Sequence, residues 1–247
     1  MICFPGSSKA DSFLDKPISN GCRGTRIGVL GGIGPESTAE FYSKLINELQ
    51  KRGLVKSNED YPQIIVNSIP APELIYDDIN EEELVSYIEG LKELDKFGVD
   101  FIVIICNTIH LYYDLLQKNI KTRIIDLRKE MNKFLMKNKI QSVFILGTPN
   151  TIKKGLYRFA KIKSYEPNIR ELSILTESIF NFNRGFERER QIKAVKEICN
   201  KYLKKGAQTI ILGCTEFAVM LGNEDFPNIN SIDILVNSTI EYMGKTK

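Results

Sequence analysis

The chain has 247 residues and a formal net charge of only +3 at pH 7, with acidic and basic residues interspersed along it. Nucleic-acid-binding proteins carry a basic patch, and this sequence shows only isolated lysine pairs, so we expect no nucleic-acid partner. No apolar run approaches the roughly 18 residues of a membrane-spanning helix, so we expect no membrane association.

Residues 1–25 contain Gly, Ser, Asp and Pro, few apolar residues and no periodicity. They lack the apolar segment of a secretory signal, and we therefore expect a disordered N-terminal extension. Cys3 and Cys22 fall in this extension and are expected to be incidental.

The first predicted strand, 27–31, runs into a glycine-rich loop of sequence Gly31-Gly32-Ile33-Gly34-Pro35-Glu36-Ser37-Thr38. Its glycines permit a tight turn and a close backbone approach to a ligand, which makes Gly32 a candidate binding residue. The loop departs from the dinucleotide fingerprint, because Ser37 replaces the third glycine and the second strand, 64–67, does not end in a ribose-binding acid. A loop for a small ligand is favoured over a nucleotide site.

Apolar spacing predicts helices over 38–52 and 81–97, separated by the second strand and a loop over 68–78. The next apolar run, 101–105, has the length of a strand buried on both faces, and Cys106 follows it directly. Asn107 and Thr108 are natural N-cap positions for a helix beginning after the cysteine. Ligands of open α/β sheets bind at such a junction, where a helix N-terminus would lower the pKa of a thiol.

The same pattern occurs twice in the chain. Gly98 precedes Cys106 by eight residues, and Gly206 precedes Cys214 by eight residues at the end of a second apolar run. Each cysteine is followed, after a helix-sized interval, by an Ile-Asp pair that we expect at the end of a further strand, at 125–126 and at 232–233. The sequence thus predicts two copies of one α/β unit.

From this repeat we expect an α/β protein of two Rossmann-like lobes related by a pseudo-twofold axis, each with a parallel four-stranded sheet flanked by helices. Lobe one is expected to comprise 26–126 and 234–247, and lobe two 127–233. Helices are predicted over 173–185 and 188–205, with a final helix over 237–243 that packs back against lobe one.

The segment Gly147-Thr148-Pro149-Asn150-Thr151 takes the place of the glycine-rich loop in lobe two. Its hydroxyl and N–H groups could hold a substrate carboxylate, or they could serve only to cap a helix. The residues leave both interpretations open.

The cysteine count favours a reducing compartment over a disulfide framework, because the five cysteines are an odd number without C-x-x-C spacing. We therefore expect a cytoplasmic location. His110 is the single histidine of the chain, which rules out a histidine-rich zinc site, and we expect no metal.

Two thiols at equivalent strand ends suit racemisation, which needs a base on one face of a Cα–H group and an acid on the other. Cys106 and Cys214 would exchange these roles for the two enantiomers if their pKa values lay near neutral pH. Two alternatives remain: each cysteine could be structural, or the pair could form a disulfide.

These residues also carry a family resemblance. The glycine-rich loop over 31–38, the segment Cys106-Asn107-Thr108-Ile109-His110 and the segment Gly213-Cys214-Thr215-Glu216 resemble the aspartate/glutamate racemase family, over about residues 26–243. The residues after the two cysteines look more like the aspartate racemase branch than the glutamate racemases.

The resemblance implies that Cys106 and Cys214 are the catalytic acid/base pair, without pyridoxal phosphate or a metal, and that the protein is a homodimer. It also implies that Asn107, Thr108, Thr148 and Thr215 bind the substrate carboxylate or ammonium group. His110 and Glu216 could tune the thiols or orient the motifs, and packing or capping roles are equally open for both.

Aspartate is the first expected substrate and glutamate the second, but two departures from the aspartate racemase pattern weaken this order. The usual Arg of an Ile-Pro-Asp-Arg loop is absent, since this chain has Ile69-Pro70-Ala71-Pro72-Glu73. A Lys that aspartate racemases often carry aligns near Glu177. Arg184, Arg158 or Lys153 could supply a replacement cation.

Three rival functions remain open. A decarboxylase or a cis-trans isomerase could use the same scaffold, although some such relatives lack one of the paired thiols. A non-catalytic amino-acid sensor could have kept the fold without the chemistry.

Overall fold

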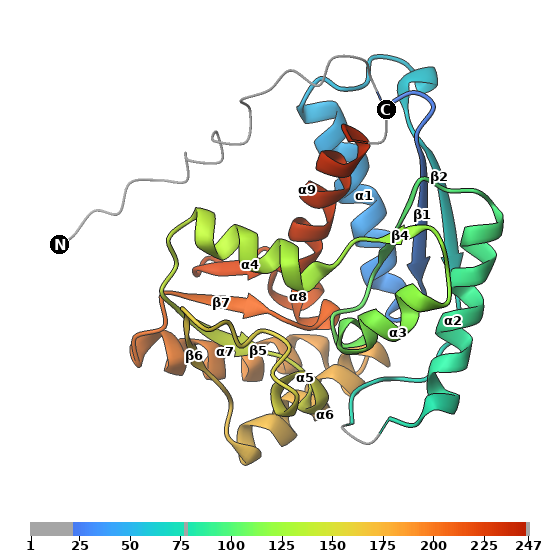
Figure 1. Ribbon diagram of the computed structural model, residues 1–247. Helices are drawn as coiled ribbons and strands as arrows, with labels where there is room; N and C mark the ends of the chain where they lie inside the picture. The colour runs from blue at the N-terminus through green and yellow to red at the C-terminus, as the bar shows by residue number, and fades with distance from the viewer. Residues whose placement is uncertain (1–21, 77–78, 246–247) are drawn as a thin grey trace.

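The computed structural model describes residues 22–76 and 79–245, which form two α/β lobes packed against each other (Figure 1). The first sheet contains β1 (Arg26–Gly31), β2 (Gln63–Ser68), β3 (Phe101–Ile104) and β4 (Arg123–Ile124), in the order β2-β1-β3-β4. The second contains β5 (Ser142–Leu146), β6 (Lys163–Tyr165), β7 (Thr209–Leu212) and β8 (Asn228–Asn230), in the order β6-β5-β7-β8. All neighbouring strands are parallel, which confirms the predicted fold class.

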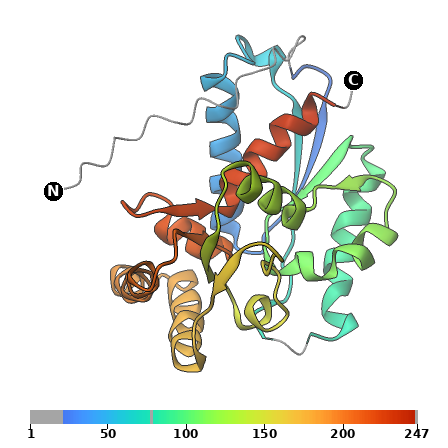
Figure 2. The ribbon, with the colours of Figure 1, turned by 60° about the vertical axis from the view of Figure 1, so that its left-hand side comes forward.

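Helices cover both faces of the first sheet (Figure 2). Alternate strand residues such as Ile27 and Val29 pack in a core cluster with α1 (Pro35–Lys51), whereas Leu30 packs in a second cluster with α2 (Glu81–Lys96). This alternation follows from the period-two geometry of a strand that is buried on both faces. After β3 come a 3-10 helix, η3 (Thr108–Tyr112), and a short helix, α3 (Tyr113–Lys118).

The remaining helices belong to the second half of the chain or join the two halves. They are α4 (Leu127–Lys137), α5 (Pro149–Lys153), α6 (Ile169–Asn183), α7 (Arg188–Lys204), α8 (Thr215–Leu221) and α9 (Ser231–Met243), and the 3-10 helix η2 (Asn58–Asp60) precedes β2. No helix in the described ranges is both long and apolar enough to cross a membrane.

One core cluster is continuous through both lobes, and α9 is the main reason. This helix follows the last strand of the second sheet, yet it packs beside α1 and α4 (Figure 1). Its apolar residues, among them Leu235 and Ile240, are almost completely buried. The lobes are therefore joined by shared packing as well as by the connecting chain.

Two expectations about chain segments need correction. Residues 1–21, with Cys3, lie outside the described residues, but Cys22 is 5% exposed and packs in the core, so the folded body begins before residue 26. The last helix begins at Ser231 instead of residue 237, because the Asn230 side chain accepts a hydrogen bond from the backbone N–H of Ile232 and caps it. The Ile232-Asp233 pair consequently lies in the first turn of α9 and is not a strand end.

Candidate active site

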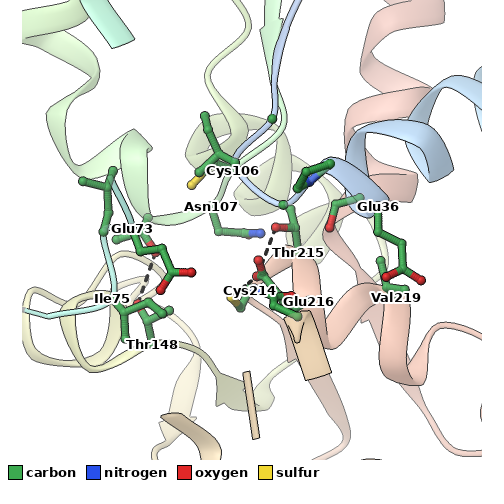
Figure 3. A pocket seen from close by; sticks show the side chains of 18 of the residues that line it. Glu36, Glu73, Ile75, Cys106, Asn107, Thr148, Cys214, Thr215, Glu216 and Val219 are labelled. Atoms are coloured by element: carbon green, nitrogen blue, oxygen red, sulfur yellow. Dashed lines mark hydrogen bonds between the residues drawn. The ribbon is translucent and has the colours of Figure 1, made fainter. Parts of the chain in front are cut away.

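A cavity of about 390 Å³ lies where the carboxyl ends of the two sheets meet (Figure 3). In a parallel sheet, the loops that follow the strands all lie at one edge of the sheet. Motifs distant in sequence therefore come together there. Every predicted site residue except His110 lines this cavity.

The two cysteines occupy matching positions. Cys106 stands two residues after the last residue of β3, and Cys214 stands two residues after the last residue of β7. Their side chains are 7% and 6% exposed, respectively, and both are free thiols. A charge on Cys106 would raise the pKa of Cys214, which shows that the thiols lie within electrostatic range of each other.

The thiol pKa values differ from the sequence-based expectation of depressed values. Burial raises the pKa of Cys106 to about 12, although the backbone N–H groups of Ile109 and Thr108 act in the opposite direction. Burial and the Glu216 carboxylate raise the pKa of Cys214 well above its usual range. The N–H groups expected from a helix start are present, but desolvation of the thiolates outweighs them.

Glu216 contacts the second thiol directly. The Sγ–H of Cys214 donates a hydrogen bond to Glu216 Oε2 at 2.7 Å, and the Thr215 hydroxyl donates to the same oxygen at 3.3 Å. The carboxylate therefore holds the Cys214 thiol in its protonated form and fixes its direction.

Threonines from both lobes contact one another at the cavity. Thr108 Oγ1 lies 3.2 Å from Thr148 Oγ1 and 3.2 Å from Thr151 Oγ1. The Thr148 hydroxyl also accepts a hydrogen bond from the backbone N–H of Thr151 and so caps α5. Thr148 thus caps α5 and also lines the cavity, so the capping role is confirmed while carboxylate binding stays a prediction.

Asn107 joins three parts of the chain. Its amide nitrogen donates to Ser231 Oγ of α9 at 3.0 Å, and its amide oxygen accepts a hydrogen bond from the Tyr157 hydroxyl. The residue is 1% exposed. Most of its hydrogen-bonding capacity is spent within the protein, so its principal effect is to fix the strand end that carries Cys106.

His110 does not reach the cavity. It is 1% exposed, with Nδ1 2.8 Å from the carbonyl oxygen of Cys106 and Nε2 3.3 Å from that of Ile125. Burial lowers its pKa, which favours the neutral imidazole. Both contacts are with backbone carbonyl oxygens, so His110 joins the Cys106 segment to the segment after β4.

Gly32 brings backbone into the cavity wall, as its sequence context indicates. Its φ of +85° is a conformation that favours glycine, and a Cβ there would lie 2.4 Å from the carbonyl oxygen of Ile69. Its N–H donates to the Thr38 hydroxyl at 3.1 Å.

The cavity also contains residues that the sequence analysis did not select. Glu73 enters from the loop after β2, Glu36 from the start of α1, and Phe182 and Asn183 from the end of α6. The position of Glu73 after a strand of the first sheet was a usable signal, whereas no motif marks the end of α6. Among the described residues, no cluster of three or more His, Cys, Asp or Glu side chains could hold a metal ion.

Residues 30–239 match the family Asp/Glu/Hydantoin racemase. The chain belongs to this family. The chain is similar to the broad specificity amino-acid racemase RacX of Bacillus subtilis, with 27% identity over 220 residues that cover 87% of this chain and 96% of the relative. It is also 25% identical to the glutamate racemase of Persephonella marina, over 64% of this chain and 63% of the relative.

Solved structures share the fold. The aspartate racemase of Picrophilus torridus superposes with a TM-score of 0.76 and 22% identity, covering 90% of this chain and 95% of that chain. The glutamate racemase of Francisella tularensis gives a TM-score of 0.59 and 21% identity, covering 89% of this chain and 80% of that chain. The family resemblance seen in the sequence is confirmed, and with it the assignment to a family of isomerases.

Proposed function

We propose that this member of the racemase family racemises an amino acid by proton transfer at Cα, with Cys106 and Cys214 as the two acid/base groups. The observation that carries the proposal is the placement of both thiols on one cavity, one from each lobe, at matching strand ends. A thiolate on one side would remove the Cα proton, while the thiol on the other side would deliver a proton to the opposite face. The product is the other enantiomer, and the proton count is unchanged.

One thiol must ionise for this reaction, and the raised pKa values of both thiols oppose that ionisation. We propose that the α-ammonium group of the bound substrate offsets this cost, because a nearby positive charge favours a thiolate. The hydroxyl groups of Thr108, Thr148 and Thr215, which line the cavity, would bind the α-carboxylate. This carboxylate gains negative charge as the carbanion forms, so donors aimed at it stabilise the transition state.

The experiment measures exchange of the Cα proton in deuterated water by NMR, and formation of the other enantiomer by chiral chromatography. Cys106→Ser and Cys214→Ser should each lower the racemisation rate by about 100-fold to 10,000-fold, since a serine hydroxyl is a far weaker acid than a thiol. Cys199→Ser is the matched control, because Cys199 is buried on α7 away from the cavity. Full racemase activity in either active-site variant would overturn the two-cysteine proposal.

The expected order of substrates, aspartate before glutamate, rests on the resemblance alone. The broad specificity racemase of Bacillus subtilis shows by its description that a relative of this chain is not restricted to one amino acid. A homodimer and a cytoplasmic location also remain predictions, the first testable by analytical ultracentrifugation of the purified protein.

A further inference from the structure

Among residues 22–76 and 79–245, the charged residues that line the cavity are all acidic. They are Glu36, Glu73 and Glu216, and none of the other described lining residues is a lysine, arginine or histidine. A site for aspartate or glutamate would need a cation for the second carboxylate of the substrate. This cavity presents the opposite charge.

Two of the three carboxylates already have partners. Glu36 forms an ion pair with Arg188 of α7, and its side chain is 54% exposed. Glu216 accepts hydrogen bonds from the Cys214 thiol and the Thr215 hydroxyl. Neither is free to meet a further charge on the substrate without losing these contacts.

Glu73 differs because no hydrogen bond or ion pair to it occurs among the described residues. Its carboxylate extends into the space between the two lobes (Figure 3). Burial, and then the charge of Glu216, raise its pKa. An unpaired carboxylate next to a second one creates a negative potential that a cation would relieve.

The candidate replacement cations do not line the cavity. Arg184 lowers the pKa of Glu73 through its charge, but its side chain lines a separate groove beside α6. Arg158 is paired with Glu166, with an Nε to Oε1 distance of 2.6 Å.

We propose that the substrate carries a positively charged side chain, of the lysine, ornithine or arginine type, and that Glu73 binds this charge. The proposal rests on the proposed racemase function and deepens it. With the α-carboxylate held by the threonine hydroxyls and the Cα–H between the thiols, the side chain extends along the cavity to Glu73. Aspartate and glutamate would instead bring a carboxylate toward Glu73, and this repulsion would exclude them.

The test compares L-lysine with L-norleucine, which has the same carbon chain but no side-chain ammonium, and with L-aspartate and L-glutamate. We expect kcat/KM for lysine to exceed that for norleucine by about 10-fold or more, the effect of one charge-assisted hydrogen bond. Glu73→Gln should lower the value for lysine by about 10-fold and leave norleucine nearly unchanged. Glu36→Gln, which removes an ion-paired carboxylate from the same cavity, should change the lysine value by no more than about threefold.

Three outcomes would overturn the proposal. Equal rates for lysine and norleucine would show that the side-chain charge is not recognised, and a preference for aspartate or glutamate would reverse the inferred charge. If Glu73→Gln lowered kcat/KM equally for lysine and norleucine, Glu73 would bind the α-ammonium group that both substrates share.

Binding measurements test the charge preference of the site independently of the proposed racemase activity. If no amino acid exchanges its Cα proton with folded, reduced protein, the proposed reaction fails. Isothermal titration calorimetry with lysine and norleucine then still decides the cation preference, because it requires no turnover. Tighter binding of lysine that is lost in Glu73→Gln supports the assignment, and equal binding overturns it.

Discussion

At the scale of single residues, the neighbours of each thiol determine its chemistry. Both cysteines are almost fully buried, and the Glu216 carboxylate contributes to the raised pKa of each. In the proposed reaction, the positive charge of a substrate would oppose this influence and favour one thiolate. Protonated thiols are poor nucleophiles, so we expect both cysteines to be alkylated slowly at neutral pH.

Glu216→Gln should make Cys214 react at lower pH. The carboxylate opposes the thiolate, whereas a neutral amide can donate an N–H group to it, so the pKa of Cys214 should fall. The measurement is the rate of iodoacetamide modification at Cys214 against pH, followed by peptide mass spectrometry. In Glu36→Gln, which leaves the contact with Cys214 intact, the profile should match that of the unmodified sequence. An unchanged or higher midpoint in Glu216→Gln would contradict the assigned role.

At the scale of elements, Asn107 ties the end of β3 to two segments from the second half of the chain. Ser231 is the first residue of α9, and Tyr157 follows α5 in sequence. Tyr157 is completely buried, and its ring also packs against Gly213, where an added Cβ would lie 3.0 Å from the ring. Tyr157 thus contacts Asn107, which follows Cys106, and Gly213, which precedes Cys214.

Tyr157→Phe should lower the free energy of unfolding by about 1 to 3 kcal/mol, because it leaves the buried Asn107 amide oxygen without its donor. Racemisation should also slow, since Asn107 fixes the strand end that carries Cys106. Tyr165→Phe is the control, as the Tyr165 hydroxyl donates to the Lys205 carbonyl oxygen in an exposed position. Urea unfolding of both variants provides the comparison, and equal losses of stability would argue against a special role for the Asn107 contact.

At the scale of the whole molecule, the buried thiols make the free energy of unfolding depend on pH in the alkaline range. Burial raises the pKa of Cys199 from 9.0 to about 12, and Cys106 and Cys214 shift in the same direction. A raised pKa means that the unfolded chain loses its proton first. The stabilising contribution is complete below pH 9 and is lost as the pH rises from there toward 12.

We therefore expect the free energy of unfolding to fall above pH 9, by about 1.4 kcal/mol per pH unit for each such thiol. Cys199→Ala should reduce this slope by the contribution of one thiol. Val195→Ala on the same helix removes buried apolar atoms without removing a titrating group, so it should lower stability at every pH and keep the slope. Urea unfolding at several pH values gives the slopes, and identical slopes in the two variants would refute the linkage.

The sequence alone was sufficient to predict two α/β lobes and a pair of strand-end cysteines facing one site. This information is local, because each apolar run followed by a cysteine forms a buried strand that ends two residues before Cys106 or Cys214. Parallel topology then brings such strand ends to the same edge of each sheet. The helix after Cys106 was predicted less well, since it begins as the 3-10 helix η3.

Only the tertiary structure decided the electrostatics of the site. The pKa values of the thiols depend on burial by neighbours far apart in sequence, and the helix-start N–H groups that the sequence predicts are outweighed. The lack of a partner for Glu73 in the described part of the chain, the ion pair of Glu36 and the position of Phe182 on α6 likewise depend on long-range contacts. Charge and solvation depend on the whole surroundings of a group, and this is why the sequence predicted which residues gather at the site but not how strongly they are charged there.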